Sequence, residues 1–526
     1  MKRYRYKDYI SNILPCLIYG ILCGSIVGAV IFFFKIAATK IVELSKYIYG
    51  KAASEPLLAV PIFLALVAFA VIMAFVHKKA PEAKGGGIPR SEGVLRGILT
   101  FRWLRTLLST FFCSMISFLC GLPLGSEGPS VLMGTALGGM CGEVSKNKTA
   151  WNRYIMTGGA GAGFAVATGA PLSGILFALE EIHKRFTPML VLTVSISVIS
   201  ASLVNEGLCG VFGIDSAMFT VGELPHFELK HVGYLLMLGV TVAICVGIFD
   251  MSIVFLGELT EKIKRLLTPT VKLIIAFVFS GLLGLFFAAG AYSGHHEILE
   301  AIVLHENAVL LLIILAVRLV MMLIATDSGA TGGIFIPTLA IGALTSALIA
   351  KMLILIGMSE QLYPTVVLLG TCAFIAGTLR SPLTASALFI ELTGQYTEML
   401  YVALVIFTVT LFTEIFNLTS FYDTVIERME KAQNCGKEPT VARFEMRVSN
   451  GAFVVGKAVR DVMWPVSSVV TSVTRATEKQ SDTDSDGEKR LYVGDRVVIR
   501  ARYFDEEQLK NHLYGLVGKD SPISKL

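Results

Sequence analysis

Long apolar stretches recur from residue 13 to about residue 418, and short polar segments separate them. Several stretches are long enough to cross about 30 Å of hydrocarbon as a helix. Gly or Pro interrupts others, and broken backbone at membrane depth is tolerated only where it is buried in protein or lines a cavity. The pattern predicts an all-α polytopic membrane protein with broken helices. Its apolar stretches lie near residues 13–41, 57–76, 106–142, 154–179, 187–204, 231–249, 270–293, 308–326, 333–350, 364–379 and 399–418.

The pattern changes after about residue 430. Residues 431–444 form a polar stretch, and residues 445–526 combine strand-like runs at 468–473 and 496–502 with a helical end. We therefore expect a membrane domain over 1–430, a linker over 431–444 and a small α+β domain over 445–526. An acidic loop at 482–487 opens like a calcium loop, but its twelfth position is Val493 instead of Glu, which favours a solvated loop.

Composition supports the membrane assignment and excludes other classes. Hydrophobic residues make up 54% of the 526 residues and charged residues 16%, which is unlike a soluble protein. The net charge of +5 is spread over loops, so it does not indicate a nucleic-acid partner. The nine cysteines form no CxxC pair, and the His and Glu side chains at 295–297 lack a third ligand at a useful spacing. We expect neither a metal site nor a cofactor.

The N-terminus begins with the basic residues Lys2, Arg3, Arg5 and Lys7. A long apolar run follows and continues to Lys35 without a convincing cleavage site. Because basic residues favour the cytoplasmic side, we expect a retained first helix with a cytoplasmic N-terminus.

Glu127 is the only acidic or basic side chain between residues 106 and 142. A carboxylate in hydrocarbon is costly, so an isolated intramembrane acid indicates a functional site. The surrounding run, Gly-Leu-Pro-Leu-Gly-Ser-Glu-Gly-Pro-Ser, breaks the helix, and a helix that restarts there points free N–H groups at an anion. We interpret Glu127 as a gate in an anion pathway.

The chain contains an internal repeat with an offset of 211 residues, because Pro171 aligns with Pro382 and the residues that follow are similar. The halves cover about 13–205 and 230–430. The Gly-rich break at 125–129 corresponds to that at 332–337. Paired breaks of this kind predict a substrate site at the interface of the two halves, near the bilayer midplane.

The repeat also sorts the carboxylates. Glu180 aligns with Glu391, so both are expected to cap or tie the same element in each half. Glu181 aligns with Leu392, and Glu127 has no acidic counterpart in 332–337. A residue that the architecture requires should appear twice, so Glu127 and Glu181 are the functional candidates.

These motifs resemble the CLC family of chloride channels and proton-coupled anion exchangers. The resemblance rests on Gly-Gly-Gly-Ile-Pro at 85–89, Gly-Ser-Glu-Gly-Pro at 125–129, Gly-Ile-Phe-Ile-Pro at 333–337 and Phe-Tyr at 421–422, in the family's order and spacing over roughly residues 15–430. It implies two inverted helical halves and a homodimer in which each subunit has its own pore.

The resemblance also implies roles for individual residues. Glu127 would be the external gating glutamate and Glu181 the internal proton-transfer glutamate. One position departs from the family pattern, because the family's serine, which donates a hydroxyl to the anion, is Gly86 in this chain. The residues implied to bind the anion are Gly86, Gly128, Ile334, Phe335 and Tyr422.

The function that we expect is exchange of chloride for protons across the membrane. Two alternatives on the same fold stay open, namely a passive voltage- or pH-gated chloride channel and a fluoride-selective exchanger. The spans contain no Ser-His, paired-Asp or His-Glu-x-x-His arrangement, so an intramembrane enzyme is not expected. We expect a multi-pass protein of a bacterial inner or plasma membrane, with both termini in the cytoplasm.

The C-terminal residues resemble the C-terminal lobe of bacterial potassium-transport regulator domains, through the segments 456–475, 492–499 and 506–516. This resemblance implies a regulatory module that dimerises and binds a small nucleotide, whereas a structural appendage is the alternative. Arg496, Arg500 and Arg502 alternate along one predicted strand, so their side chains should share one face.

Overall fold

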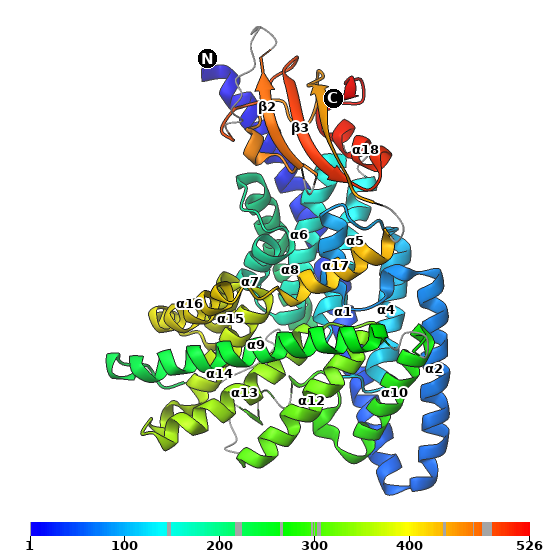
Figure 1. The fold of residues 1–526 in the computed structure, drawn as a ribbon, viewed down its shortest axis with the longest axis vertical. Helices are drawn as coiled ribbons and strands as arrows, with labels where there is room; N and C mark the ends of the chain where they lie inside the picture. Colours follow the sequence, from blue (N-terminus) through cyan, green and yellow to red (C-terminus); the bar gives the residue numbers. More distant parts are fainter. Residues whose placement is uncertain are drawn as a thin grey trace.

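The computed structural model describes residues 2–144, 149–215, 224–262, 267–295, 298, 300–301, 307–434, 438–465, 468–475 and 487–526. The described residues form a helical body and, at one end of it, a small domain with a sheet (Figure 1). This architecture confirms the predicted fold class. Most of the acidic loop at 482–487 and residues 296–297 lie outside the described residues.

The helical body consists of two runs of helices. The first run contains α1 (Lys2–Ser54), α2 (Ala59–Lys79), α3 (Gly87–Leu95), α4 (Trp103–Leu119), α5 (Glu127–Val144), α6 (Thr149–Thr168), α7 (Pro171–Phe177) and α8 (Pro188–Phe212). The second run contains α9 (Val232–Lys262), α10 (Pro269–Phe286), α12 (Ala308–Ser328), α13 (Phe335–Leu355), α14 (Tyr363–Leu379), α15 (Pro382–Thr393), α16 (Met399–Ile415) and α17 (Phe421–Gln433).

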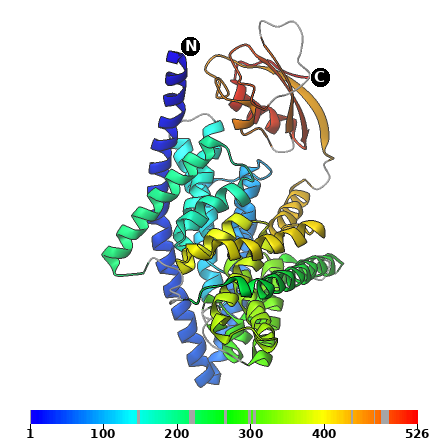
Figure 2. The same cartoon turned by 90° about the vertical axis from the view of Figure 1, so that its left-hand side faces the viewer.

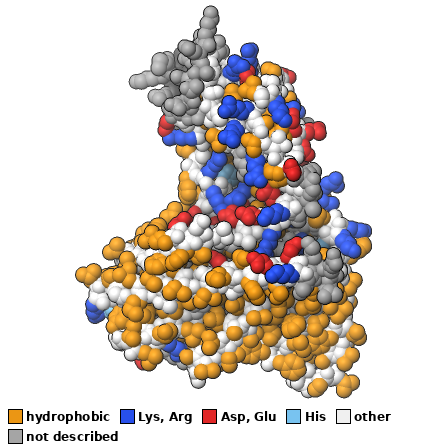
Figure 3. Space-filling model, in the orientation of Figure 1, with side chains coloured by type: hydrophobic (Ala, Val, Ile, Leu, Met, Phe, Trp, Pro, Cys, Tyr) orange, Lys and Arg blue, Asp and Glu red, His pale blue; other side chains and the backbone are white. Residues whose placement is uncertain are grey.

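Nine helices within the described residues are long and apolar enough to cross a membrane. Many large apolar side chains on them face outward, and Figure 3 shows hydrophobic side chains covering the helical body. Charged side chains gather instead on the sheet domain and where it meets the body. This distribution is the one expected of a protein whose body lies in lipid.

The centre of the body is built from helices whose residues are mostly buried. Every residue of α14 except Pro364 is buried, and so are most residues of α13. The rings of Phe164 and Phe177 stack at 4.2 Å, and the Phe335 ring packs edge-on against Phe164 at 5.1 Å. These contacts join α6 and α7 of the first run to α13 of the second.

The C-terminal domain contains a four-stranded antiparallel sheet in the order β2-β3-β1-β4. Val497, Ile499 and Ala501 face its buried side, as do Leu509 and Leu513 of the helix. Strand β1 begins at residue 440, inside the segment predicted as a linker. The elements are β1 (Thr440–Arg447), β2 (Ser468–Thr474), β3 (Arg496–Tyr503), α18 (Glu506–Val517) and β4 (Ile523–Lys525).

The domain docks on the helical body beside the N-terminal part of α1 (Figure 2). The Tyr154 hydroxyl donates to the Asp461 carbonyl at 2.9 Å, and the Arg153 guanidinium donates to the Met463 carbonyl at 3.2 Å. The Phe453 ring packs edge-on against Trp151 with centroids 5.6 Å apart. The interface is therefore both apolar and hydrogen-bonded, and it centres on α6.

Candidate functional site

The two Gly-rich breaks predicted from the repeat meet in the centre of the body. The Gly125 N–H donates to the Gly333 carbonyl at 2.6 Å, and the Gly333 N–H donates to the Gly125 carbonyl at 2.7 Å. This antiparallel bridge joins the segment before α5 to the segment before α13, so residues more than 200 positions apart form one site.

A third Gly-rich segment, at 85–87, joins the same site. The Gly85 N–H donates to the Gly329 carbonyl at 2.9 Å. A Cβ atom on Gly87 would collide with the backbone of Gly128, and one on Gly128 would lie 2.7 Å from the Cα of Gly333. Glycine is therefore required at these positions because three backbones approach one another closely.

Helix N-termini converge around this point. Helices α3, α5 and α13 begin at Gly87, Glu127 and Phe335, directly after the three segments, and α17 packs on α3. The first N–H groups of a helix lack intrahelical partners and carry the positive end of its dipole. The site thus presents backbone donors to an anion without a charged side chain.

Tyr422 lies in the first turn of α17 and is fully buried. Its hydroxyl has no hydrogen-bond partner among the described residues, and the ring lies within electrostatic range of Glu127 and Glu181. Ile334 and Phe335, at the start of α13, are also buried. The Tyr422 hydroxyl, which is left without a partner among the described residues, and the helix N-termini together could hold an anion.

Glu127 is the first residue of α5 and is completely buried. The Ser126 hydroxyl donates to its Oε1 at 3.2 Å, whereas Oε2 has no hydrogen-bond partner in the described part of the chain. A Cβ atom on Gly125 would collide with Oε2. The carboxylate therefore folds back onto the bridged loops, where it would compete with an anion.

Glu181 lies in the π-helical turn Ala178–Ile182, which continues α7. Single π-turns are rare and often mark functional positions. The carboxylate is 1% exposed, and Oε2 accepts a hydrogen bond from the Ser381 hydroxyl at 2.7 Å. The other oxygen, Oε1, is buried and has no hydrogen-bond partner among the described residues.

Glu180 and Glu391 form a reciprocal clasp between the two halves. Glu180 accepts hydrogen bonds from the N–H groups of Leu383 and Thr384, at 3.0 and 2.8 Å, at the start of α15. Glu391 accepts from the N–H groups of Leu172 and Ser173, at 2.6 and 2.8 Å, at the start of α7. Each half thus caps a helix of the other, which is the structural role that their alignment predicts.

A charged network lies beside Glu181 and joins α3, the loop after the π-turn and α17. Lys184 contacts Asp423 at 2.7 Å and Glu92 at 3.5 Å. Arg96 contacts the same two carboxylates, with 3.2 Å to Asp423. Asp423 directly follows Tyr422, so the network fixes the helix turn that carries the candidate anion ligand.

Two cavities approach the bridged loops from different sides. One, of about 640 Å³, reaches Gly85 and Gly86 and is lined by basic side chains that include Lys84, Arg90 and Arg428. The other, of about 770 Å³, is lined by the C-terminal half of α1 and reaches Ser126, the neighbour of Glu127. Both cavities therefore reach residues that adjoin the Gly-rich segments of the site.

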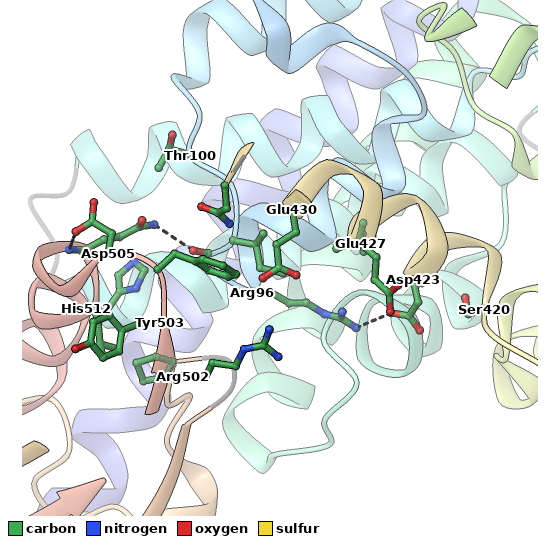
Figure 4. Close-up of a pocket in the computed structure, with 18 of the residues that line it drawn as sticks. Arg96, Thr100, Ser420, Asp423, Glu427, Glu430, Arg502, Tyr503, Asp505 and His512 are labelled. Carbon is green, nitrogen blue, oxygen red and sulfur yellow. Dashed lines mark hydrogen bonds and ion pairs between the residues drawn. The ribbon is translucent and has the colours of Figure 1, made fainter. Parts of the chain in front are cut away.

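A third cavity, of about 840 Å³, lies between the body and the C-terminal domain (Figure 4). Figure 4 shows Glu427 and Glu430 of α17 across this space from Arg502 of β3, with Arg96 reaching Asp423. In the described part of the chain, no carboxylate lies within ion-pair distance of Arg502. The cavity is therefore lined by charged side chains of both signs, between α17 and the C-terminal domain.

The three arginines predicted to share one face of β3 have different surroundings in the structure. Arg496, Arg500 and Arg502 are all exposed on the same face of the strand, as their alternation indicates. However, Arg496 pairs with Glu445, and only Arg502 lines the cavity. The three side chains therefore do not converge on one ligand within a single chain.

The sequence did not predict a role for Ser381 or for the charged network around Asp423. The repeat does hold a signal for Ser381, since the offset of 211 places it opposite Ala170. Among the described residues, no group of three or more His, Cys, Asp or Glu side chains could hold a metal ion.

Comparison with known proteins identifies the family. The family model described as voltage gated chloride channel matches residues 67–414, which include the three Gly-rich segments but not Tyr422. The H(+)/Cl(-) exchange transporter ClcA of Vibrio cholerae serotype O1 (strain M66-2) is 31% identical over 452 residues, covering 81% of this chain and 94% of that protein. The chain belongs to the CLC family. CLC proteins are transporters or channels, so the chain is not an enzyme.

Other CLC proteins show the same extent of similarity. ClcA of Salmonella typhimurium is 29% identical over 444 residues, covering 81% of this chain and 92% of that protein. The crystal structure of a slow cyanobacterial Cl-/H+ antiporter aligns with a TM-score of 0.74 and 27% identity, covering 80% of this chain and 99% of that one. A CLC-type fluoride/proton antiporter shares the fold, with a TM-score of 0.60 and 19% identity. This CLC chain is thus a multi-span membrane protein.

Proposed function

We propose that this CLC protein exchanges chloride for protons, with Glu127 as the external gate and Glu181 as the internal proton-transfer group. The observation that carries the proposal is the pair of buried carboxylates, each with one oxygen that lacks a partner among the described residues. Both lie within electrostatic range of Tyr422. The relatives named H(+)/Cl(-) exchange transporter support the same activity.

The proposed gate works by competition between anions. A deprotonated Glu127 carboxylate occupies the space beside the N–H groups of α5 and α13, where a chloride ion would otherwise bind. When Glu127 takes up a proton, it loses its charge and its attraction to these donors, so chloride can enter. We assign the anion contacts to Gly86, Gly128, Ile334, Phe335 and Tyr422.

Glu181 gives protons a route that chloride does not take. It lies near Tyr422 but outside the Gly-rich segments, in a buried turn flanked by the network of Glu92, Lys184 and Asp423. A proton that reaches Glu181 from the cytoplasm could pass to Glu127 when the gate turns inward. Anion binding and proton uptake then become linked steps.

The test is to reconstitute the protein in liposomes and to record chloride and pH together. We expect an outward chloride gradient to drive proton uptake against a pH gradient. Glu127→Gln and Glu181→Gln should each keep chloride flux and abolish the coupled proton movement. Chloride movement without any pH change at every imposed gradient would instead support the passive channel.

A fluoride-selective exchanger is the remaining alternative, and competition experiments with fluoride and chloride in the same liposomes distinguish it. Preference for fluoride by more than tenfold would favour this alternative. The central Tyr422 and the unmodified Gly-Ser-Glu-Gly-Pro segment argue for chloride.

We also propose that the C-terminal domain regulates transport through the cavity between α17 and the domain. The cavity is lined by Asp423, which follows Tyr422, and by Arg502 of the domain, which has no carboxylate within ion-pair distance among the described residues. A small nucleotide could pair its phosphate with Arg502 and alter the contact between the domain and α17. Calorimetry of the full chain with cyclic dinucleotides and adenine nucleotides tests this idea. Binding that Arg502→Ala does not weaken would place the ligand elsewhere.

The proposed setting is a homodimer in a bacterial inner membrane, with both termini in the cytoplasm. Light scattering of the detergent-solubilised protein tests the dimer. Protease access to the C-terminal domain in vesicles of known orientation tests the topology. If protease outside right-side-out vesicles cleaves the C-terminal domain, the domain lies on the external side and the proposed topology is wrong.

A further inference from the structure

Ser381 is a fully buried residue whose hydroxyl donates to Glu181 Oε2 at 2.7 Å. It occupies the N-cap position of α15, where a serine usually accepts a hydrogen bond from the helix N–H groups. Ser381 makes no such cap bond. Glu180 already accepts from the N–H groups of Leu383 and Thr384, so the Ser381 hydroxyl is left for Glu181.

The equivalent position in the first half shows that the architecture does not need this hydroxyl. Ala170 is the N-cap of α7, with φ −124° and ψ 84°, and Ser381 has φ −124° and ψ 69°. Glu391 caps α7 just as Glu180 caps α15. The same helix start is therefore built with alanine, without a side-chain hydroxyl.

Both partners of the Ser381–Glu181 hydrogen bond break the repeat. Ser381 lies opposite Ala170, and Glu181 lies opposite Leu392. By contrast, Glu180 and Glu391, which cap α15 and α7, align with each other in the repeat. A bond formed by the two residues that depart from the symmetry belongs to a pathway that exists once per chain.

We propose that Ser381 is a positioning residue that holds the Glu181 carboxylate through Oε2 and leaves Oε1 to receive and release the transported proton. This inference rests on the proposed proton-transfer role of Glu181. Protonation adds one proton to Oε1 and neutralises the carboxylate, and the same O–H bond breaks when the proton leaves. The hydroxyl of Ser381 keeps its own proton throughout.

Charged groups on three elements surround the pair. Glu92 lies on α3, Lys184 follows the π-turn, and Asp423 lies on α17, and all three are within electrostatic range of Glu181. Substitution of Ser381 leaves these three residues unchanged, so a comparison of the Ser381 variants isolates the contribution of the hydroxyl. The hydroxyl stabilises the charged carboxylate, because a hydrogen bond to a charged acceptor is stronger than one between neutral groups.

The test compares Ser381→Ala with Ser381→Thr, which keeps a hydroxyl, in liposomes that report chloride and proton flux together. For Ser381→Ala we expect the proton-to-chloride flux ratio to fall several-fold. We also expect the pH midpoint of proton transport to move by about one unit to more alkaline pH, which is about a tenfold change in proton affinity. Ser381→Thr should retain most of the ratio, and Ala170→Ser at the equivalent cap serves as the matched control.

The outcomes separate this inference from the proposed function. A wild-type ratio and pH midpoint in Ser381→Ala, with coupling abolished in Glu181→Gln, overturns the role of Ser381 and leaves that of Glu181 standing. Full coupling in Glu181→Gln overturns the proposed function itself. An equal loss of ratio in Ser381→Ala and Ser381→Thr would show that side-chain volume at the cap, instead of the hydroxyl, controls the pathway.

Discussion

At the scale of single residues, the site depends on space that glycine leaves open. The Glu127 carboxylate reaches its closed position only because Gly125 has no Cβ atom. Gly86 differs, since a Cβ atom there would lie 3.7 Å from both the Gly332 carbonyl oxygen and Pro89 Cδ, which is ordinary van der Waals contact. Position 125 therefore excludes a side chain, whereas position 86 has room for a small one.

Gly125→Ala should displace the Glu127 carboxylate from the bridged loops. The deprotonated gate then no longer blocks the pathway, so we expect chloride efflux at pH 8 to rise several-fold and to depend less on pH. Flux measurements in liposomes from pH 5 to pH 8 check this. Gly207→Ala is the control, because no atom lies within 4 Å of a Cβ atom at that position. A wild-type pH profile in Gly125→Ala would contradict the closed position of the carboxylate.

Gly86→Ser should tighten chloride binding, because the hydroxyl adds one donor to a buried site that has room for it. A neutral hydrogen bond is worth about 0.5–1.5 kcal/mol, which corresponds to a few-fold to about tenfold in Kd. Isothermal titration calorimetry measures the change. Gly86→Ala adds the volume without the donor and should not improve binding. If serine and alanine have equal effects, the missing hydroxyl has no role in chloride affinity.

At the scale of elements, a glutamate from each half caps a helix of the other half. The carboxylate of Glu391 accepts from two backbone N–H groups and one hydroxyl at the start of α7. Glu180 makes the matching three bonds at the start of α15. These bonds join elements about 200 residues apart, so they stabilise the contact between the halves as well as each helix.

Glu391→Gln should lower the stability of the helical body without removing proton coupling. The amide nitrogen of glutamine cannot accept a hydrogen bond, so at least one N–H group at the start of α7 loses its partner. This costs about 1–3 kcal/mol in the free energy of unfolding. Thermal unfolding in detergent measures the loss. Glu414→Gln removes an exposed carboxylate that pairs with Arg380 and should cost less than about 1 kcal/mol. Equal Tm values for the two variants would contradict a stabilising role of the Glu391 hydrogen bonds.

At the scale of the whole molecule, the C-terminal domain rests on the body through α6 and the segment after α3. The Gln508 side-chain amide donates to the Gly97 carbonyl at 3.1 Å, and the His512 ring lies directly over Gly97. Burial lowers the pKa of His512 below its ordinary value of 6.5, with a smaller contribution from Arg153. Docking therefore favours the neutral imidazole over the charged one.

Docking should weaken as the pH falls. An undocked histidine titrates near pH 6.5, so below that pH the undocked domain binds more protons than the docked one. The contribution of His512 is thus fully present above about pH 6.5 and is lost progressively below it. The hydrogen-exchange protection factors of residues 95–100 and 506–517, which are corrected for the intrinsic pH dependence of exchange, measure this loss at pH 7.5 and pH 5.5. In His512→Asn these protection factors should not change between the two pH values, and an equal change in both proteins would contradict the role of His512.

The sequence by itself determined the membrane class, the repeat and the isolated position of Glu127. Hydrophobic length and the spacing of Gly and Pro are properties of the chain alone, so they can be read without coordinates. The Gly-rich motifs also indicated the family, which the comparisons confirmed. The assignment of individual residues to gate, proton transfer and anion binding stays a prediction.

Only the tertiary structure decided which groups meet. The bridge between Gly125 and Gly333, the hydrogen bond from Ser381 to Glu181 and the position of His512 over Gly97 each join segments far apart in the chain. Each contact depends on how the helices pack in three dimensions, which local periodicity does not encode. The start of β1 at residue 440 follows the same rule, because its strand pairing with β3 overrides the polar composition of the segment.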